Sequence, residues 1–185
     1  MREHGVLKRI LLIYREAIRR LDAGEPPPTP AVAHSAQIIR AFIEDYHERL
    51  EEQYVFPPLE RAGQLSETTA VLRLQHQRGR VLTDQIQTIA CGSDTPDAAQ
   101  RRTLRDAMAA FIRMYEPHEA REDTVVFPAL RDVVPPGEFS ELGEVFEDEE
   151  HRRFGPDGFG DVVAQVAAIE KDLGIYELSQ FTPHG

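Results

Sequence analysis

The sequence predicts an all-α protein, an antiparallel up-down four-helix bundle with a short helical C-terminal extension. Apolar residues recur at spacings of three and four through most of the 185 residues, a periodicity that favours amphipathic helices. The alternation of apolar and polar residues that marks half-buried strands is nearly absent. Proline and glycine clusters divide the periodic segments into long helices with short connections, which favours antiparallel neighbours.

The first two helices are expected at about residues 2–22 and 31–61. A proline-rich stretch at 25–30 stops the first helix, and Pro30 suits the start of the second. Gly63 then acts as a C-terminal breaker of the second helix. The apolar stripes that define the two helices are Leu7, Leu11, Tyr14, Ile18 and Leu21 in the first and Ile39, Ile43, Leu50 and Tyr54 in the second.

The third helix is expected to begin after Ser66, a favourable N-cap residue, and to end near Gly92. The fourth is expected over about residues 97–132, before a Pro-Pro-Gly turn. Its inward stripe contains Leu104, Phe111 and Val125.

We therefore expect two parts, a bundle over residues 1–135 and an extension over residues 136–185 packed on it. Within the extension, weaker helical patterns cover about 138–154 and 160–173, separated by a Gly/Pro loop. The oligomeric state does not follow from the sequence.

Charge and composition exclude several classes of partner. The chain has 32 Asp and Glu against 21 Lys and Arg, a formal charge of −11, whereas a nonspecific grip on nucleic acid or an anionic membrane needs the opposite sign. No apolar run approaches the ~20 residues that a membrane span requires. The single cysteine, Cys91, excludes an intrachain disulfide and a CxxC metal site, and no signal-peptide pattern is found. We therefore expect a cytoplasmic protein without nucleic-acid or membrane partners.

An internal repeat carries the main functional signal. Residues 47–59 align without gaps to residues 118–130, and seven of the thirteen aligned positions are identical. Each copy begins His-Glu and places a second Glu four residues after the His. These pairs are His47 with Glu51 and His118 with Glu122.

A spacing of four puts the His and Glu of each pair on one helical face, about 5–6 Å apart at Cβ. The apolar stripes indicate that both faces point into the core. A hydrogen-bonded His–Glu pair in each helix is the simplest alternative to a metal site. Burial of a carboxylate costs several kcal/mol unless it is paired or metal-bound, and two facing carboxylates cost more.

His4 and His76 lie on the inward stripes of the first and third helices. Together the helices would present four imidazoles and two carboxylates, more donors than one tetrahedral zinc accepts. Two metal ions bridged by Glu51 and Glu122 fit this set. Imidazole and carboxylate ligands favour iron, with manganese or zinc as alternatives.

The order His4, His47-x-x-x-Glu51, His76, His118-x-x-x-Glu122 resembles the hemerythrin-like HHE cation-binding domain over about residues 1–132. The resemblance implies a non-haem di-iron site with mainly His ligands, two bridging carboxylates and an oxo or hydroxo bridge. It also implies an open coordination position for dioxygen or a similar small molecule.

One departure from the oxygen-carrying members concerns the third helix, where Arg80 stands at the position of a second His. His151 is the candidate for a replacement ligand, because the segment around it resembles the C-terminal extension of some bacterial members. The helical periodicity does not itself support this assignment.

The leading functional hypothesis is a protein that binds or senses dioxygen, or a related ligand such as nitric oxide. One alternative is a redox enzyme of the oxidase, peroxidase or nitric oxide reductase type, which would use an electron-transfer partner. Another is an iron-storage or iron-sensing module. No nucleophile array or phosphate-binding loop indicates a different chemistry.

Overall fold

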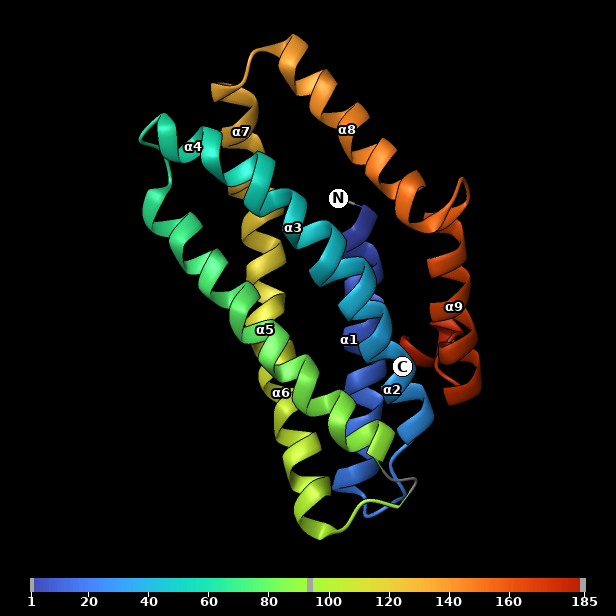
Figure 1. Ribbon diagram of the computed structural model, residues 1–185. Coiled ribbons are helices and arrows are strands. Elements are labelled where there is room, and N and C mark those ends of the chain that lie inside the picture. Colours follow the sequence, from blue (N-terminus) through green and yellow to red (C-terminus); the bar gives the residue numbers. More distant parts are fainter. Residues whose placement is uncertain (1, 93–94, 184–185) are drawn as a thin grey trace.

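The computed structural model describes residues 2–92 and 95–183, and every regular element within them is helical. Four long helical segments run alternately up and down, and each packs against the next along the chain (Figure 1). The predicted all-α bundle is confirmed. Its α-helices are α1 (Arg2–Asp22), α2 (Thr29–Ile38), α3 (Glu48–Leu50), α4 (Phe56–Arg61), α5 (Ser66–Gly92), α6 (Ala98–Arg121), α7 (Phe127–Val133), α8 (Pro136–Phe154) and α9 (Gly158–Leu173).

The second and fourth long segments contain π-helical turns that the regular periodicity did not predict. In the second segment, α2, α3 and α4 are joined by π-helix at Ile39–His47 and Glu51–Val55. In the fourth, Glu122–Val126 joins α6 to α7. The two turns that begin at the repeated glutamates are equivalent: the N–H of Phe56 bonds to the carbonyl of Glu51, and that of Phe127 to Glu122.

A proline follows each of these phenylalanines, at Pro57 and Pro128. Proline lacks an N–H, and its ring clashes with the carbonyl four residues earlier in a regular helix. Widening the preceding turn accommodates both effects. The repeated Phe-Pro step was therefore the sequence signal for the π-turns, which often occur at functional sites.

The extra residue in each π-turn changes which side chains face the core. Tyr54 and Val125 were expected on the inward stripes, but both are only half-buried. The next residue along the chain, Val55 or Val126, is buried instead. The expected stripes are thus wrong after the glutamates, because a strict 3.6-residue period does not hold across a π-turn.

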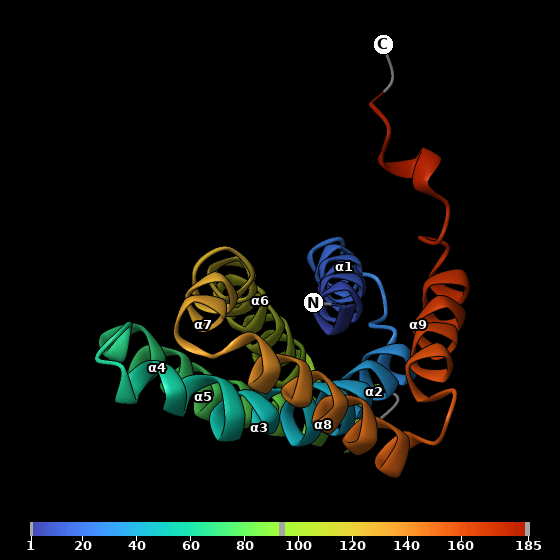
Figure 2. The same ribbon diagram turned by 90° about the horizontal axis from the view of Figure 1, so that it is seen from above.

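The C-terminal segment contributes to the main hydrophobic core. α9 packs against α1 and α2, and its apolar face joins the same buried cluster as the bundle helices. α8 lies alongside the second long segment and runs antiparallel to it, with Phe146 beside Tyr54 and Phe154 beside Phe42 (Figure 1). Phe146 also contacts the hydrophobic cluster at the α4–α7 end of the bundle. Beyond α9, the chain leaves the body as an arm with a short 3₁₀ turn at Leu178–Phe181 (Figure 2).

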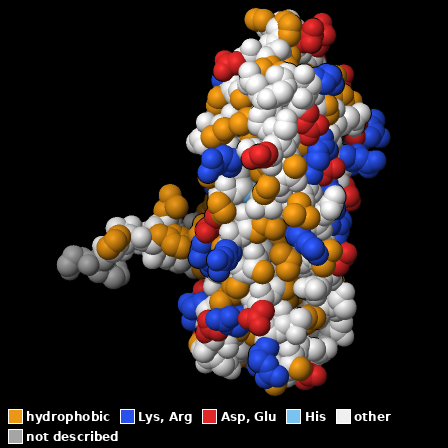
Figure 3. All heavy atoms as spheres, turned by 90° about the vertical axis from the view of Figure 1, so that its left-hand side faces the viewer, with side chains coloured by type: hydrophobic (Ala, Val, Ile, Leu, Met, Phe, Trp, Pro, Cys, Tyr) orange, Lys and Arg blue, Asp and Glu red, His pale blue; other side chains and the backbone are white. Residues whose placement is uncertain are grey.

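The face viewed in Figure 3 carries intermingled charged and apolar side chains. Within residues 2–92 and 95–183, none of the helices has both the length and the apolar character needed to span a bilayer.

Gly79 lets the Tyr115 side chain of α6 lie close against the backbone of α5. A Cβ added at Gly79 would lie 2.0 Å from the hydroxyl oxygen of Tyr115. The Tyr115 ring is buried against Phe111 and His118, so it has little freedom to move away. The phenol of Tyr115 therefore fills the space beside Gly79.

We predict that Gly79→Ala lowers the free energy of unfolding by about 1–3 kcal/mol, because the overpacking outweighs the gain in helix propensity. Urea unfolding monitored by circular dichroism measures the change. Gly143→Ala on α8 is the control, because nothing lies within 4 Å of a Cβ added there. Equal effects of the two substitutions would contradict this account.

Candidate metal centre

Six of the seven predicted donors meet in the interior of the bundle, each no more than 4% exposed. They form two groups that share Glu122, and within each group the donor atoms lie within 4.8 Å of one another. We call these groups the four-donor end and the three-donor end. The four-donor end comprises His4, His47, Glu51 and Glu122, and the three-donor end comprises His76, His118 and Glu122.

The imidazoles of each end face one another through their Nε2 atoms. Nε2 of His4 lies 2.9 Å from Nε2 of His47, and Nε2 of His76 lies 3.2 Å from Nε2 of His118. In each pair, one His belongs to the repeat and the other to α1 or α5. Each end therefore joins two helices that are distant in sequence.

The two glutamates lie between the imidazole pairs. One oxygen of Glu51 is 3.3 Å from Nε2 of His47, and the other is 3.7 Å from Nε2 of His76. Glu122 similarly has one oxygen 3.4 Å from Nε2 of His4 and the other 3.1 Å from Nε2 of His118. Each carboxylate thus spans both ends, as a bridging ligand would.

The ionisation of the cluster reflects its burial. Burial, followed by the charge of Glu122, raises the pKa of Glu51 well above its usual range. Burial would also raise the pKa of Glu122, but the neighbouring imidazoles of His118 and His4 outweigh it and lower that pKa. Burial and the proximity of His4 lower the pKa of His47, which favours the neutral imidazole that binds metals.

Carboxylates hold two of the imidazoles from their outer side. Nδ1 of His4 donates to Asp123 at 3.0 Å, and Nδ1 of His76 donates to Glu52 at 2.9 Å. Donation from Nδ1 selects the tautomer whose Nε2 lone pair points into the cluster. Burial would raise the pKa of Glu52, but hydrogen bonds from His76 and Arg80 lower it to about 2.

Glu52 and Asp123 were not among the predicted site residues, although they occupy equivalent positions in the repeat, directly after Glu51 and Glu122. That shared acidic position was the available signal. Gln75, which accepts a hydrogen bond from Nδ1 of His118 at 2.8 Å, has no counterpart in the repeat and gave no such signal.

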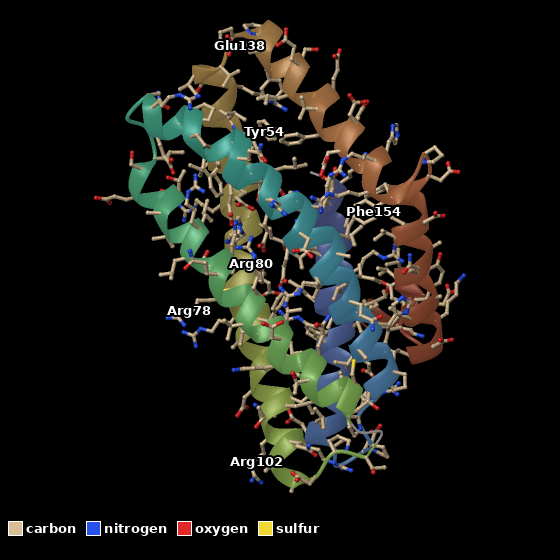
Figure 4. All side chains as sticks on the ribbon, in the orientation of Figure 1. Tyr54, Arg78, Arg80, Arg102, Glu138 and Phe154 are labelled. Carbon is tan, nitrogen blue, oxygen red and sulfur yellow. The ribbon has the colours of Figure 1, made fainter. Side chains whose placement is uncertain are left out.

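Arg80 pairs with Glu52, which orients His76, and with Glu48, a further buried carboxylate. Its guanidinium lies 3.0 Å from Glu52 and 3.1 Å from Glu48, on the side of α5 that faces α3 (Figure 4). The other oxygen of Glu48 accepts a hydrogen bond of 2.5 Å from Tyr115. Arg80 therefore pairs with carboxylates that orient and adjoin the cluster.

The structure does not bring His151 to the cluster. Its side chain is exposed on α8, and the preceding residue, Glu150, is the one that turns inward. Glu150 pairs with Arg2 at 2.7 Å and lies near the Tyr46 hydroxyl. This orientation agrees with the helical periodicity, which had given no support to His151 as a ligand.

The donor set fits divalent or trivalent metal ions. Both oxygens of Glu51 and one of Glu122 are buried without a hydrogen-bond partner among the described residues. Because Nδ1 of His4 and Nδ1 of His76 each donate to a carboxylate outside the cluster, the Nε2 atom of each ring is an acceptor. Lone pairs and negative charge thus converge where a cation would satisfy them.

Residues 1–130 match the Hemerythrin HHE cation binding domain family. The chain belongs to this family. The predicted membership is confirmed, and the hemerythrin domain together with the His/Glu groups makes this a metal-binding protein by family and by donor geometry.

Similar curated proteins include uncharacterized proteins of Mycobacterium tuberculosis (strain H37Rv) and Mycobacterium bovis. Each is 67% identical to this hemerythrin-family chain over 183 residues, which cover 99% of the chain and 72% of the relative. No solved structure matches the chain.

Glu119 is a further buried carboxylate beside this hemerythrin-type site, and one of its oxygens has no hydrogen-bond partner among the described residues. Burial raises its pKa to about 7. A carboxyl group with a raised pKa in the folded state favours folding below its unfolded-state pKa, and that contribution is lost as pH rises through the folded value.

We predict that Glu119→Gln stabilises the metal-free protein at pH 8 by on the order of 2 kcal/mol, and that the gain disappears as pH falls toward 4.5, the ordinary pKa of Glu. Urea unfolding across this pH range measures the difference. Glu144→Gln, at an exposed position on α8, should show no such pH dependence. A gain for Glu119→Gln that grows toward low pH would contradict the prediction.

Proposed function

We propose that the protein binds two iron ions in the cluster and uses them to bind or sense dioxygen or a related small ligand such as nitric oxide. The single observation that carries this proposal is the position of Glu51 and Glu122, each with oxygens directed to two imidazole pairs. One ion could not use both ends of both carboxylates together with four imidazoles.

The donor chemistry favours iron over softer or harder metals. Neutral imidazoles and carboxylates suit iron, with manganese and zinc as alternatives, whereas thiolate sites select other metals. When bound, iron would supply a change of oxidation state and a coordination position for a small ligand.

The protein's own part is to hold the donors in place and to exclude water. Phe56 stacks on His76 with ring centroids 5.7 Å apart, and Phe127 lies 6.0 Å from His4. Glu52 and Asp123 fix the same two imidazoles from outside. Each of these rings is therefore constrained by an aromatic neighbour and by a hydrogen bond at Nδ1, which limits the rearrangement needed when a metal binds.

We predict that Glu51→Ala and Glu122→Ala each lower the bound metal from two equivalents to one or fewer, because each removes a carboxylate shared by both positions. Metal analysis after iron loading and desalting measures this loss. His34→Ala is the control, because His34 lies on α2 and contacts Gln165 on α9. Unchanged metal content in both glutamate variants would overturn the assignment.

The functional test follows the visible spectrum of reduced, iron-loaded protein as air is admitted under controlled conditions. For a carrier or sensor, we expect an absorption band that appears with air and disappears when oxygen is removed. Steady consumption of dioxygen, peroxide or nitric oxide in the presence of a reductant would instead identify a redox enzyme. Metal binding with neither response would favour iron storage or iron sensing.

A further inference from the structure

The arm that follows α9 presents two apolar side chains to solvent. Leu178 is 83% exposed and Phe181 is 53% exposed. They begin and end a 3₁₀ turn, in which residues three apart lie above one another, so both point to the same side of the arm. We call this pair the apolar knob. Glu177, directly before it, is also exposed and makes no ion pair within the described part of the chain.

A surface groove between α1 and α6 has the complementary character. Its volume is about 660 Å³, and its apolar lining consists of Ile18, Ala109 and Ile112. Three arginines and two acidic side chains complete the lining, which leaves one positive charge in excess. Arg113 is the arginine of this set that makes no ion pair within residues 2–92 and 95–183. The groove therefore offers an apolar floor and an unpaired cation.

The arm and the groove lie on the same side of the molecule and at the same level along the bundle. The arm projects beyond the face formed by α1 and α6 (Figure 2). It starts beside α1, where Arg20 donates a hydrogen bond of 2.9 Å to the carbonyl of Leu173, and the groove is lined by the same stretch of α1. The arm runs away from the body (Figures 2 and 3), so the knob does not occupy the groove of its own chain. Another hollow with an excess positive charge is lined by α8 and the second long segment, on the opposite side of the molecule from the arm.

We propose that the arm binds the α1–α6 groove of a second copy of this chain, and that two copies exchange arms about a twofold axis. The apolar knob covers the floor of the partner's groove, and Glu177 pairs with the partner's Arg113. Each copy gives one arm and receives one, so the assembly closes as a dimer. This inference concerns assembly and does not depend on the proposed metal function.

The first test measures the molar mass of the full chain over a range of concentrations by analytical ultracentrifugation. The wild-type protein should pass from monomer to dimer as its concentration rises. The double substitution Leu178→Ala and Phe181→Ala should raise the dimer dissociation constant at least tenfold, because each dimer loses two buried knobs. Val81→Ala is the matched control: Val81 is 47% exposed on α5, outside the groove, and its loss should leave dimerisation unchanged.

A charge exchange tests the pairing of the arm with this particular groove. Glu177→Arg and Arg113→Glu should each raise the dissociation constant severalfold, because each places like charges opposite one another. Both substitutions in one chain should restore dimerisation, since every arm then meets a groove of opposite charge. Both residues are exposed, so the single variants should fold like the wild type. Failure of the double variant to recover would contradict the assigned contact.

Cross-linking distinguishes exchange between copies from folding of the arm onto its own body. In a chain with Cys91→Ser, the pair Glu177→Cys and Arg113→Cys should form a covalent dimer on oxidation, visible on a non-reducing gel and lost on reduction. A cross-linked monomer would show that the arm binds its own groove and would overturn the proposal. Wild-type protein that stays monomeric at its highest soluble concentration, or that assembles beyond a dimer, would do the same.

Discussion

The burial of two carboxylates in one apolar interior is the constraint on which the rest of this structure depends. Glu51 and Glu122 are each 1% exposed, and three of their four oxygens lack a hydrogen-bond partner among the described residues. Removing such groups from water is costly unless a positive charge or a proton compensates. The π-turns that begin at these glutamates and the four surrounding imidazoles bring the donor atoms together at one place in the core. A cation bound there would compensate for the buried carboxylates.

The supporting contacts follow an approximate twofold relationship between the halves of the bundle. The first copy of the repeat places Glu52 and Phe56 against His76 on α5, and the second copy places Asp123 and Phe127 against His4 on α1. Each half therefore supports the imidazole supplied by the other. The symmetry breaks at His118, whose outer nitrogen donates to the neutral amide of Gln75 and not to a carboxylate.

Sequence periodicity predicted the bundle, the helix limits to within a few residues and the six buried donors, because the donors lie on apolar stripes. It failed at Tyr54 and Val125, where an extra residue in the turn rotates the following side chains. It also could not place Gln75 or Arg80, whose roles arise from contacts between helices rather than from spacing within one helix. His151 is the opposite case. The family resemblance suggested it as a ligand, but its side chain is exposed on α8.

The reciprocal support also makes each half of the bundle depend on the other half for the orientation of a donor. The helical hairpins at residues 2–61 and 66–133 each contain one inward His outside the repeat, one His-Glu pair, and one acidic residue that orients the inward His of the other hairpin. Neither hairpin therefore orients its own inward imidazole outside the repeat, because Asp123 holds His4 and Glu52 holds His76. A substitution at Glu52 or Asp123 thus acts on a donor supplied by the opposite half of the bundle.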